Sequence, residues 1–239
     1  MAIEQTLGQA LTGISSMATR HVLAELAGVY EQRSRQPIAI ESVGGIDAAR
    51  RVQDGEPFDF VVLAADAIDR LAITGRVDPV RRIDLAQSGV AIAVAAGAPR
   101  PDIGTEPAFR QAVLAARSIG YSTGPSGAHL VRLFERWGIA ETIAPRSVIA
   151  PPGVPVGQLV ARGEVALGFQ QSSELMHVPG IDVIGALPPE VQLVTVFTAA
   201  LCSGSPRPED TNALLSFLAS PAAEAAKRRH GMEPAGGRR

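Results

Sequence analysis

Four short segments of this chain are rich in serine, glutamine and glycine, and each follows a hydrophobic run and precedes a helical one. They are GISSMA (13–18), SVGG (42–45), YSTGPSGAH (121–129) and GFQQSSE (168–174). At the start of a helix the backbone N–H groups lack an intrahelical acceptor and the helix dipole is positive, which favours a bound anion. In open α/β sheets such turns converge at the carboxyl ends of the strands. The sequence therefore predicts a site for a small anion.

Two titratable residues in these segments are candidates for acid–base chemistry. His129 falls in the first turn of an expected helix, where the positive helix end favours the neutral imidazole that a base requires, while an anionic ligand would favour the charged form. Glu174 also falls in a first turn, where a carboxylate interacts favourably with the dipole even without a function. The structural alternatives are a packed histidine and a dipole-stabilising carboxylate.

The uncharged residues have structural alternatives as well. For Ser15 and Ser16 the structural alternative is a cap at the N-terminus of the helix that follows, a common role of serine. Gly44, Gly45 and Gly124 are interpreted either as parts of ligand-binding segments or as turn glycines with positive φ. The glutamine pair 170–171 is either a set of ligand donors or a solvated helix start.

Composition narrows the functional classes. The 22 lysine and arginine residues are balanced by 24 acidic ones and only 4% of residues are aromatic, so a nucleic acid partner is not expected. The basic cluster Lys227–Arg229 is instead typical of a helix C-terminus. The single cysteine, Cys202, excludes an internal disulfide, and His21, His177 and His230 lack ligand spacing. The sequence indicates neither a metal site nor a cofactor.

The segment Met1–Leu11 has no basic stretch, no unbroken apolar core and no small-residue cleavage site, so it does not read as a secretory signal. We therefore expect a cytoplasmic protein as the sequence stands, or a periplasmic one if a leader has been removed. No apolar run approaches the roughly 18 residues of a membrane span, so membrane insertion is not expected.

Strand-like and helical runs alternate along the chain, which predicts an α/β fold. The expected strands are Ile38–Val43, Phe58–Ala65, Gly89–Ala96, Ser118–Tyr121, Arg146–Ala150, Val165–Phe169, Asp182–Ile184 and Val191–Cys202. The first expected helix follows Ser15–Ser16, and another is capped by Asp66 and ends at Gly75. The other expected helices cover 46–53, 107–117, 125–137, 208–218 and 221–230. The tail Pro234–Arg239 is expected to fray.

The 239 residues, 46% of them hydrophobic, suffice for one large domain or two lobes. Two segments, Leu85–Gly89 and Val191–Cys202, are candidates for crossings between lobes. This predicts one lobe from 1–85 completed by 197–239 and a second from 86–196, with a ligand cleft between them that opens by hinge motion.

The order of these segments resembles a known family. SSMA, DGEPFDFVVLAAD, YSTGPSGAH and GEVALGFQQSSEL, in that order, are similar to the type-2 periplasmic substrate-binding fold, in its molybdate-binding-protein-like branch. APRPDI (98–103), SGAHLVRLFERWGI (126–139), LPPE (187–190) and FTAALC (197–202) resemble a divergent subgroup that includes aconitate isomerase. The resemblance implies two α/β lobes and an inter-lobe cleft that holds an anion by hydroxyl and backbone N–H groups.

Together with the polar segments, the resemblance implies a set of ligand-binding residues. They are Ser15, Ser16, Gly44, Gly45, Ser122, Thr123, Ser126, Gly127, Val154, Gln170, Gln171 and Ser172. The chain departs from the molybdate pattern because Gly44 and Gly45 replace an expected serine and Gln171 replaces a tyrosine. With Ser172 and Ser173, the glutamines offer donors over a larger volume, which suits a carboxylate better.

Two functions remain open at this stage. A binding protein would capture a small anion, a polycarboxylate or an oxyanion, and would pass it to an ABC transporter permease if exported. An isomerase of aconitate-like tricarboxylates would also need a base, His129 or Glu174, to move a proton along an allylic system. The fold is used mainly for binding, which favours the first function. Serine-type catalysis is not favoured, because 124–127 lacks the G-x-S-x-G spacing.

Overall fold

The computed structural model describes residues 9–151 and 153–235. The expectations about a leader and about a frayed tail fall largely on residues 1–8 and 236–239, which lie outside the described residues. Both compact units of the chain mix helices with sheet strands, so the α/β class predicted from the sequence is confirmed.

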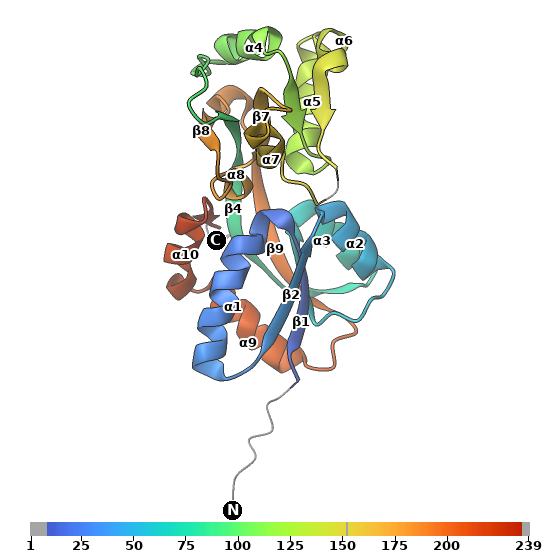
Figure 1. The fold of residues 1–239 in the computed structure, drawn as a ribbon. Helices are drawn as coiled ribbons and strands as arrows, with labels where there is room; N and C mark the ends of the chain where they lie inside the picture. The colour runs from blue at the N-terminus through green and yellow to red at the C-terminus, as the bar shows by residue number, and fades with distance from the viewer. Residues whose placement is uncertain (1–8, 152, 236–239) are drawn as a thin grey trace, which may run out of the picture. The chain divides into compact units, whose positions relative to one another are not determined.

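Unit 1 comprises the described residues of Met1–Ala86 and Val196–Arg239, and unit 2 comprises Gln87–Thr195 (Figure 1). Two long strands, β4 (Val77–Ala95) and β9 (Val194–Cys202), contribute residues to both units. The chain therefore leaves unit 1 within one strand and returns within another.

The sheet of unit 1 has the strand order β2-β1-β3-β9-β4. Its first three strands are parallel, and β9 runs antiparallel to β3. The remaining elements of unit 1 are β1 (Leu11–Ser16), η1 (Met17–Thr19), α1 (Arg20–Ser34), β2 (Ile38–Val43), α2 (Gly45–Gln53), β3 (Phe60–Ala64), α3 (Ala65–Ile73), α9 (Pro208–Ala219), η4 (Pro221–Ala223), α10 (Glu224–Arg229) and β10 (Glu233–Pro234).

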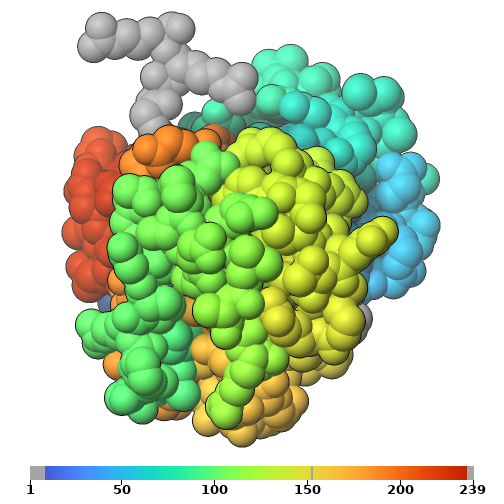
Figure 2. Space-filling view, turned by 90° about the horizontal axis from the view of Figure 1, so that it is seen from above, coloured from blue at the N-terminus to red at the C-terminus, as the bar shows by residue number. Residues whose placement is uncertain are grey.

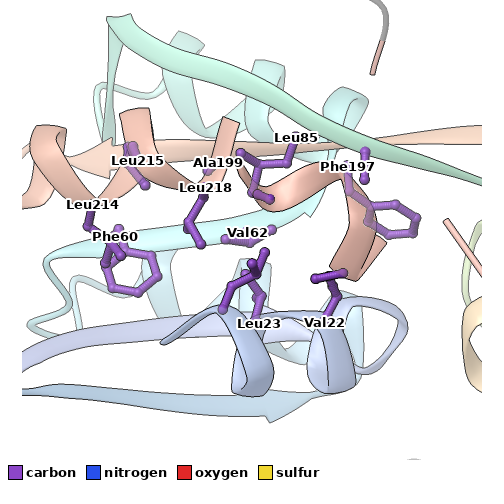
Figure 3. Packing of buried hydrophobic residues seen from close by; sticks show 14 of the residues in the cluster. Val22, Leu23, Phe60, Val62, Leu85, Phe197, Ala199, Leu214, Leu215 and Leu218 are labelled. Carbon is purple, nitrogen blue, oxygen red and sulfur yellow. The ribbon is translucent and has the colours of Figure 1, made fainter. Parts of the chain in front are cut away.

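Alternation along β3 divides the core of unit 1 into two layers. Phe60 and Val62 face α1 and α9, where Figure 3 shows them packed among leucine side chains from both helices and a valine from α1. Val61 and Leu63 face the opposite side, which α2 and α3 cover. Because both faces are buried, β3 reads as a continuous apolar run in the sequence.

The sheet of unit 2 has the strand order β4-β7-β5-β6, with β8 also paired to β4. Strands β5, β6 and β7 are parallel, and β7 is antiparallel to β4. The elements of unit 2 are α4 (Glu106–Ala115), β5 (Ile119–Tyr121), α5 (Pro125–Arg136), α6 (Ala140–Ile143), η2 (Ala144–Arg146), β6 (Ser147–Ile149), α7 (Val156–Ala161), β7 (Leu167–Gln171), α8 (Ser172–Leu175), β8 (Ile181–Ala186) and η3 (Pro189–Val191).

The sheet of unit 2 is covered on both faces. Leu167 and Phe169 of β7 point to the core formed with α4, α5 and α6. In Figure 2 the segments that include α4 and α5, coloured green to yellow-green, form part of the surface that faces the viewer. Gly168 faces α7, where an added Cβ would lie 2.5 Å from Val160 Cγ2, so the close packing of α7 requires glycine at this position.

Most element positions agree with the predictions, and the differences have local causes. Asp66 does not cap α3, because the N-cap is Ala64 and the Asp66 carboxylate accepts a hydrogen bond from Arg70 at 2.9 Å. Strand β4 begins at Val77, twelve residues before the expected start, within a stretch too polar to read as a strand. Helix α7 was not predicted, because its six residues are too few to show a helical period.

Candidate functional site

The carboxyl ends of three parallel strands lie together in unit 1. The register aligns Ser15 of β1 with Ser42 of β2 and with Val62 of β3. Each strand leads at once into a helix: β1 into η1 and α1, β2 through Gly44 into α2, and β3 into α3. The predicted residues Ser15, Ser16, Gly44 and Gly45 are therefore neighbours at one edge of this sheet.

Ser15 and Ser16 play different parts at this edge because they point to opposite faces of β1. The Ser15 hydroxyl is fully buried and lies 2.8 Å from the Ser42 hydroxyl, so it ties β1 to β2. The Ser16 hydroxyl is also buried, with 8% of the residue exposed, but it has no hydrogen-bond partner among the described residues and makes no capping bond. An unpaired buried hydroxyl is costly, and a ligand atom would satisfy it.

The glycines at this edge are not turn glycines with positive φ. Gly44 is the N-cap of α2 with a φ of −57°, and Gly45 begins the helix. A Cβ on Gly45 would lie 3.7 Å from the Ser16 Cβ, so the first turn of α2 is adjacent to the unpaired hydroxyl. The turn-glycine alternative is wrong here, as it is for Gly124, which has a φ of −73°.

Unit 2 repeats the arrangement with β5, β6 and β7, whose register aligns Tyr121 with Ile149 and with Phe169. The segment Ser122–Gly127 follows β5 and leads into α5. Within it, the Gly124 N–H donates to Ser122 Oγ at 3.4 Å, and a Cβ on Gly127 would lie 1.6 Å from the Ser122 carbonyl oxygen. The loop is therefore closed tightly on itself. Ser126 is buried within it and Thr123 is exposed.

His129 is the fifth residue of α5, just past the first turn in which it was expected, and its ring is engaged. The Nε2 atom lies 2.7 Å from the carbonyl oxygen of Val191, at the end of η3. A carbonyl only accepts, so Nε2 carries a proton and donates it. Any role of His129 as a base would have to use Nδ1, and the observed contact ties α5 to η3.

Glu174 is held in unit 2 by a short chain of hydrogen bonds. The Val156 N–H, at the start of α7, donates to Gln170 Oε1 at 2.8 Å, and Gln170 Nε2 donates to Glu174 Oε2 at 2.6 Å. Burial raises the pKa of the Glu174 carboxyl to about 7, although the hydrogen bond from Gln170 acts in the opposite direction. This carboxyl can therefore both accept and release a proton near neutral pH.

Gln171 is engaged as firmly as Gln170, on the opposite face of β7. In the amide orientation that satisfies every neighbour, its Nε2 donates to the carbonyl oxygens of Ser88 and Gly89 at 2.9 and 3.2 Å, and its Oε1 accepts from Thr195 Oγ1 at 2.9 Å. Both glutamine side chains are thus hydrogen-bonded within the protein. Their structural alternative, a solvated helix start, is wrong for both.

Serines around Gln171 differ in their exposure. Ser173 is 2% exposed, and its hydroxyl has no partner among the described residues, while its N–H donates to Ser88 Oγ at 3.4 Å. Ser172 is partly exposed at the start of α8. Ser88 and Thr195 lie on the crossing strands β4 and β9, and no local signal in the sequence could have linked them to Gln171.

The remaining predicted contact, Val154, uses its N–H within a turn, where it donates to the Pro151 carbonyl oxygen at 3.0 Å. Among the described residues, no cluster of three or more His, Cys, Asp or Glu side chains is arranged to hold a metal ion. Within residues 9–151 and 153–235, every helix is too short or too polar to span a bilayer.

The sequence from residue 11 to residue 233 matches the family described as bacterial extracellular solute-binding protein. The chain belongs to this family. It is also 40% identical, over 230 residues, to an aconitate isomerase from Pseudomonas sp., a match that covers 94% of this chain and 87% of the relative. The resemblance predicted from the sequence motifs is thereby confirmed.

Solved structures support the same fold. The periplasmic molybdate-binding protein of Azotobacter vinelandii superposes with a TM-score of 0.77 at 19% identity, covering 93% of this chain and 98% of that one. AgtB of A. tumefaciens, solved in complex with agropinic acid, gives a TM-score of 0.75 at 11% identity, covering 95% and 84%. At these identities the comparison shows a common periplasmic-binding-protein-like fold.

Proposed function

We propose that this protein binds a small anion, a polycarboxylate or an oxyanion, at the carboxyl ends of its parallel strands. The observation that carries the proposal is the Ser16 hydroxyl, buried and unpartnered among the described residues, beside the first turn of α2. Membership of a solute-binding family supports it. A carboxylate ligand is favoured over molybdate by the 40% identical relative, whose name specifies aconitate.

The donors available to such a ligand are uncharged. The four polar segments 13–18, 42–45, 121–129 and 168–174 contain no lysine or arginine. Neutral hydrogen bonds and helix N-termini would then carry recognition, so affinity should depend only modestly on salt. Hydrogen bonds to a charged ligand contribute about 1.5–3 kcal/mol each, enough for a few well-placed donors to give selective binding.

Calorimetry on the variant Ser16→Ala tests this proposal against trans-aconitate, citrate, molybdate and sulfate. Loss of the hydroxyl should weaken binding by about 1–3 kcal/mol, roughly 5- to 150-fold in Kd, without loss of stability, since the hydroxyl has no partner among the described residues. Thr211→Val is the matched control, because Thr211 in α9 also carries a buried hydroxyl without a partner among those residues. The proposal fails if no anion binds, or if Ser16→Ala binds every anion as the parent does.

A second candidate function, isomerisation of an aconitate-like tricarboxylate, is favoured by two observations. One is the 40% identity to an aconitate isomerase. The other is Glu174, whose pKa of about 7 suits a group that takes a proton from one end of an allylic system and returns one to the other end. Only the proton and the double bond change position, so the step needs no cofactor.

Incubation with cis- or trans-aconitate in deuterated water tests this second function. An isomerase would interconvert the two acids and exchange hydrogen with solvent, and Glu174→Gln should abolish turnover while ligand affinity stays within about tenfold. Activity that survives Glu174→Gln but not His129→Gln would move the role to His129. Binding without interconversion or exchange would leave only the binding function.

We further propose that the protein is exported and that it delivers the anion to a partner, an ABC transporter permease. The description of the family as bacterial extracellular solute-binding proteins supports export. Cell fractionation that finds the full-length protein only in the cytoplasm would contradict it.

A further inference from the structure

The Glu174 carboxyl is held in one position but uses only part of its hydrogen-bonding capacity. Gln170 fixes Oε2 at 2.6 Å, and Gln170 is itself fixed by the Val156 N–H at 2.8 Å. Gln170 is 3% exposed, so this supporting amide is buried. The second oxygen, Oε1, has no hydrogen-bond partner among the described residues and remains available to a ligand.

Among the described residues of unit 2, no opposite charge compensates this carboxyl. Helix α8 packs against α7 and β7 and contacts β4 through Ser88, and residues 87–95, 156–161 and 167–171 contain no ionisable side chain. Asp182 on the neighbouring strand β8 is paired with Arg100 at 3.2 Å. His177, in the turn after α8, is exposed. The ionised form of Glu174 is therefore stabilised by little more than the amide of Gln170.

A bound anion would make the ionised carboxyl less stable still. Two negative groups at hydrogen-bond distance repel each other, whereas a protonated carboxyl can donate a hydrogen bond to a ligand oxygen. We propose that Glu174 takes up a proton when an anion binds at the strand ends of unit 2, so that anion capture is coupled to protonation. This inference rests on the proposed anion-binding function and excludes Glu174 as the base of an isomerase, because a carboxyl that is protonated in the complex cannot take a proton from the ligand.

The direction of the pH dependence follows from this coupling. In the free protein the Glu174 pKa is about 7, and a nearby anion would raise it further. Affinity should then be highest and nearly constant well below pH 7. Above pH 7 it should fall by up to about tenfold per pH unit, because binding must supply the missing proton.

Titration calorimetry of the full chain with trans-aconitate at pH 8, in Tris and in HEPES, measures the proton directly. The two buffers differ in ionisation enthalpy, so the difference in heat gives the number of protons taken up. We expect uptake approaching one proton per anion for the parent. Glu174→Gln keeps the size and offers a permanent N–H donor, and it should show no uptake and no loss of affinity between pH 7 and 9.

Glu164→Gln is the matched control, since Glu164 is an exposed glutamate of the same unit, and it should behave as the parent does. Binding by the parent without proton uptake at pH 8, or unchanged uptake in Glu174→Gln, would overturn the inference. Absence of binding to all four anions would instead refute the anion-binding function. If Glu174→Gln fails to fold, the parent alone tests the inference. Its proton uptake on anion binding must increase from pH 6 to pH 8, and constant uptake would overturn the inference.

Discussion

Replacing Glu174 by glutamine should stabilise the protein at alkaline pH and leave its stability almost unchanged in acid. Burial raises the pKa of this carboxyl from 4.5 to about 7. At about 1.4 kcal/mol per pH unit, ionisation in the folded state costs at most about 3.5 kcal/mol. The side chain retains some solvent contact, which reduces the expected figure to about 2 kcal/mol.

The pH window follows from the direction of this change. Below pH 4.5 the carboxyl is protonated in both the folded and the unfolded chain. Between pH 4.5 and 7 the folded chain keeps a proton that the unfolded chain has lost, so the stability contributed by the protonated group declines as pH rises and is gone above pH 7. Glutamine does not titrate, so its advantage over glutamate grows across the same interval.

Thermal unfolding followed by circular dichroism at pH 4.5, 6 and 8 provides the assay. The difference between Glu174→Gln and the parent should be near zero at pH 4.5 and reach about 4–8 °C in Tm at pH 8, the shift for about 2 kcal/mol in a chain of this size. Glu164→Gln should show no such trend. A Glu174→Gln effect that is equal at all three pH values, or destabilising at pH 8, would refute the reasoning.

Two further predictions concern packing and a buried ion pair. Gly127→Ala places a Cβ 1.6 Å from the Ser122 carbonyl oxygen, and thermal unfolding should show a loss of stability of more than about 3 kcal/mol. Gly28→Ala in α1, where a Cβ would have no atom within 4 Å, should instead gain about 0.5–1 kcal/mol of stability. Equal stability of the two variants would contradict this prediction. Arg207→Ala removes the 2.7 Å partner of buried Asp59 and should cost about 3–5 kcal/mol at pH 7. Burial alone would raise the pKa of Asp59, but the hydrogen bonds that it accepts lower it. The stability deficit of Arg207→Ala should therefore shrink as pH falls below 3.8 and Asp59 takes up a proton. Urea unfolding that shows equal deficits at pH 7 and pH 3 would contradict this prediction.

Local patterns were sufficient for two strands of unit 1, of which β3 is buried on both faces and β2 is only partly buried. The strand predicted at Ile38–Val43 agrees with β2 at both ends, and the apolar run Phe58–Ala65 contains β3. The first half of β4 lacked such a pattern, because 77–88 alternates charged and apolar residues around a proline. Its pairing with β9, more than a hundred residues away, makes it a strand.

The environments of the Gln170 and Gln171 side chains could not be predicted from the sequence. Gln170 and Gln171 are adjacent and were predicted to act together as ligand donors, yet alternation along β7 sends them to opposite faces of the sheet. Gln170 supports Glu174, and Gln171 joins the strands that carry Ser88 and Thr195. The environment of each amide depends on elements that approach from distant parts of the chain.

The sequence by itself determined the α/β class, the family and the polar segments at the strand ends, because residue type, periodicity and motif order are local properties of the chain. Only the tertiary structure decided which polar groups in those segments are already paired. Ser15 meets Ser42 across two strands, while Ser16, its neighbour, is left with an unpaired hydroxyl. Glu174 has a shifted pKa because β7 and α7 bury it without a counter-charge among the described residues of unit 2, and burial depends on contacts that no local pattern records.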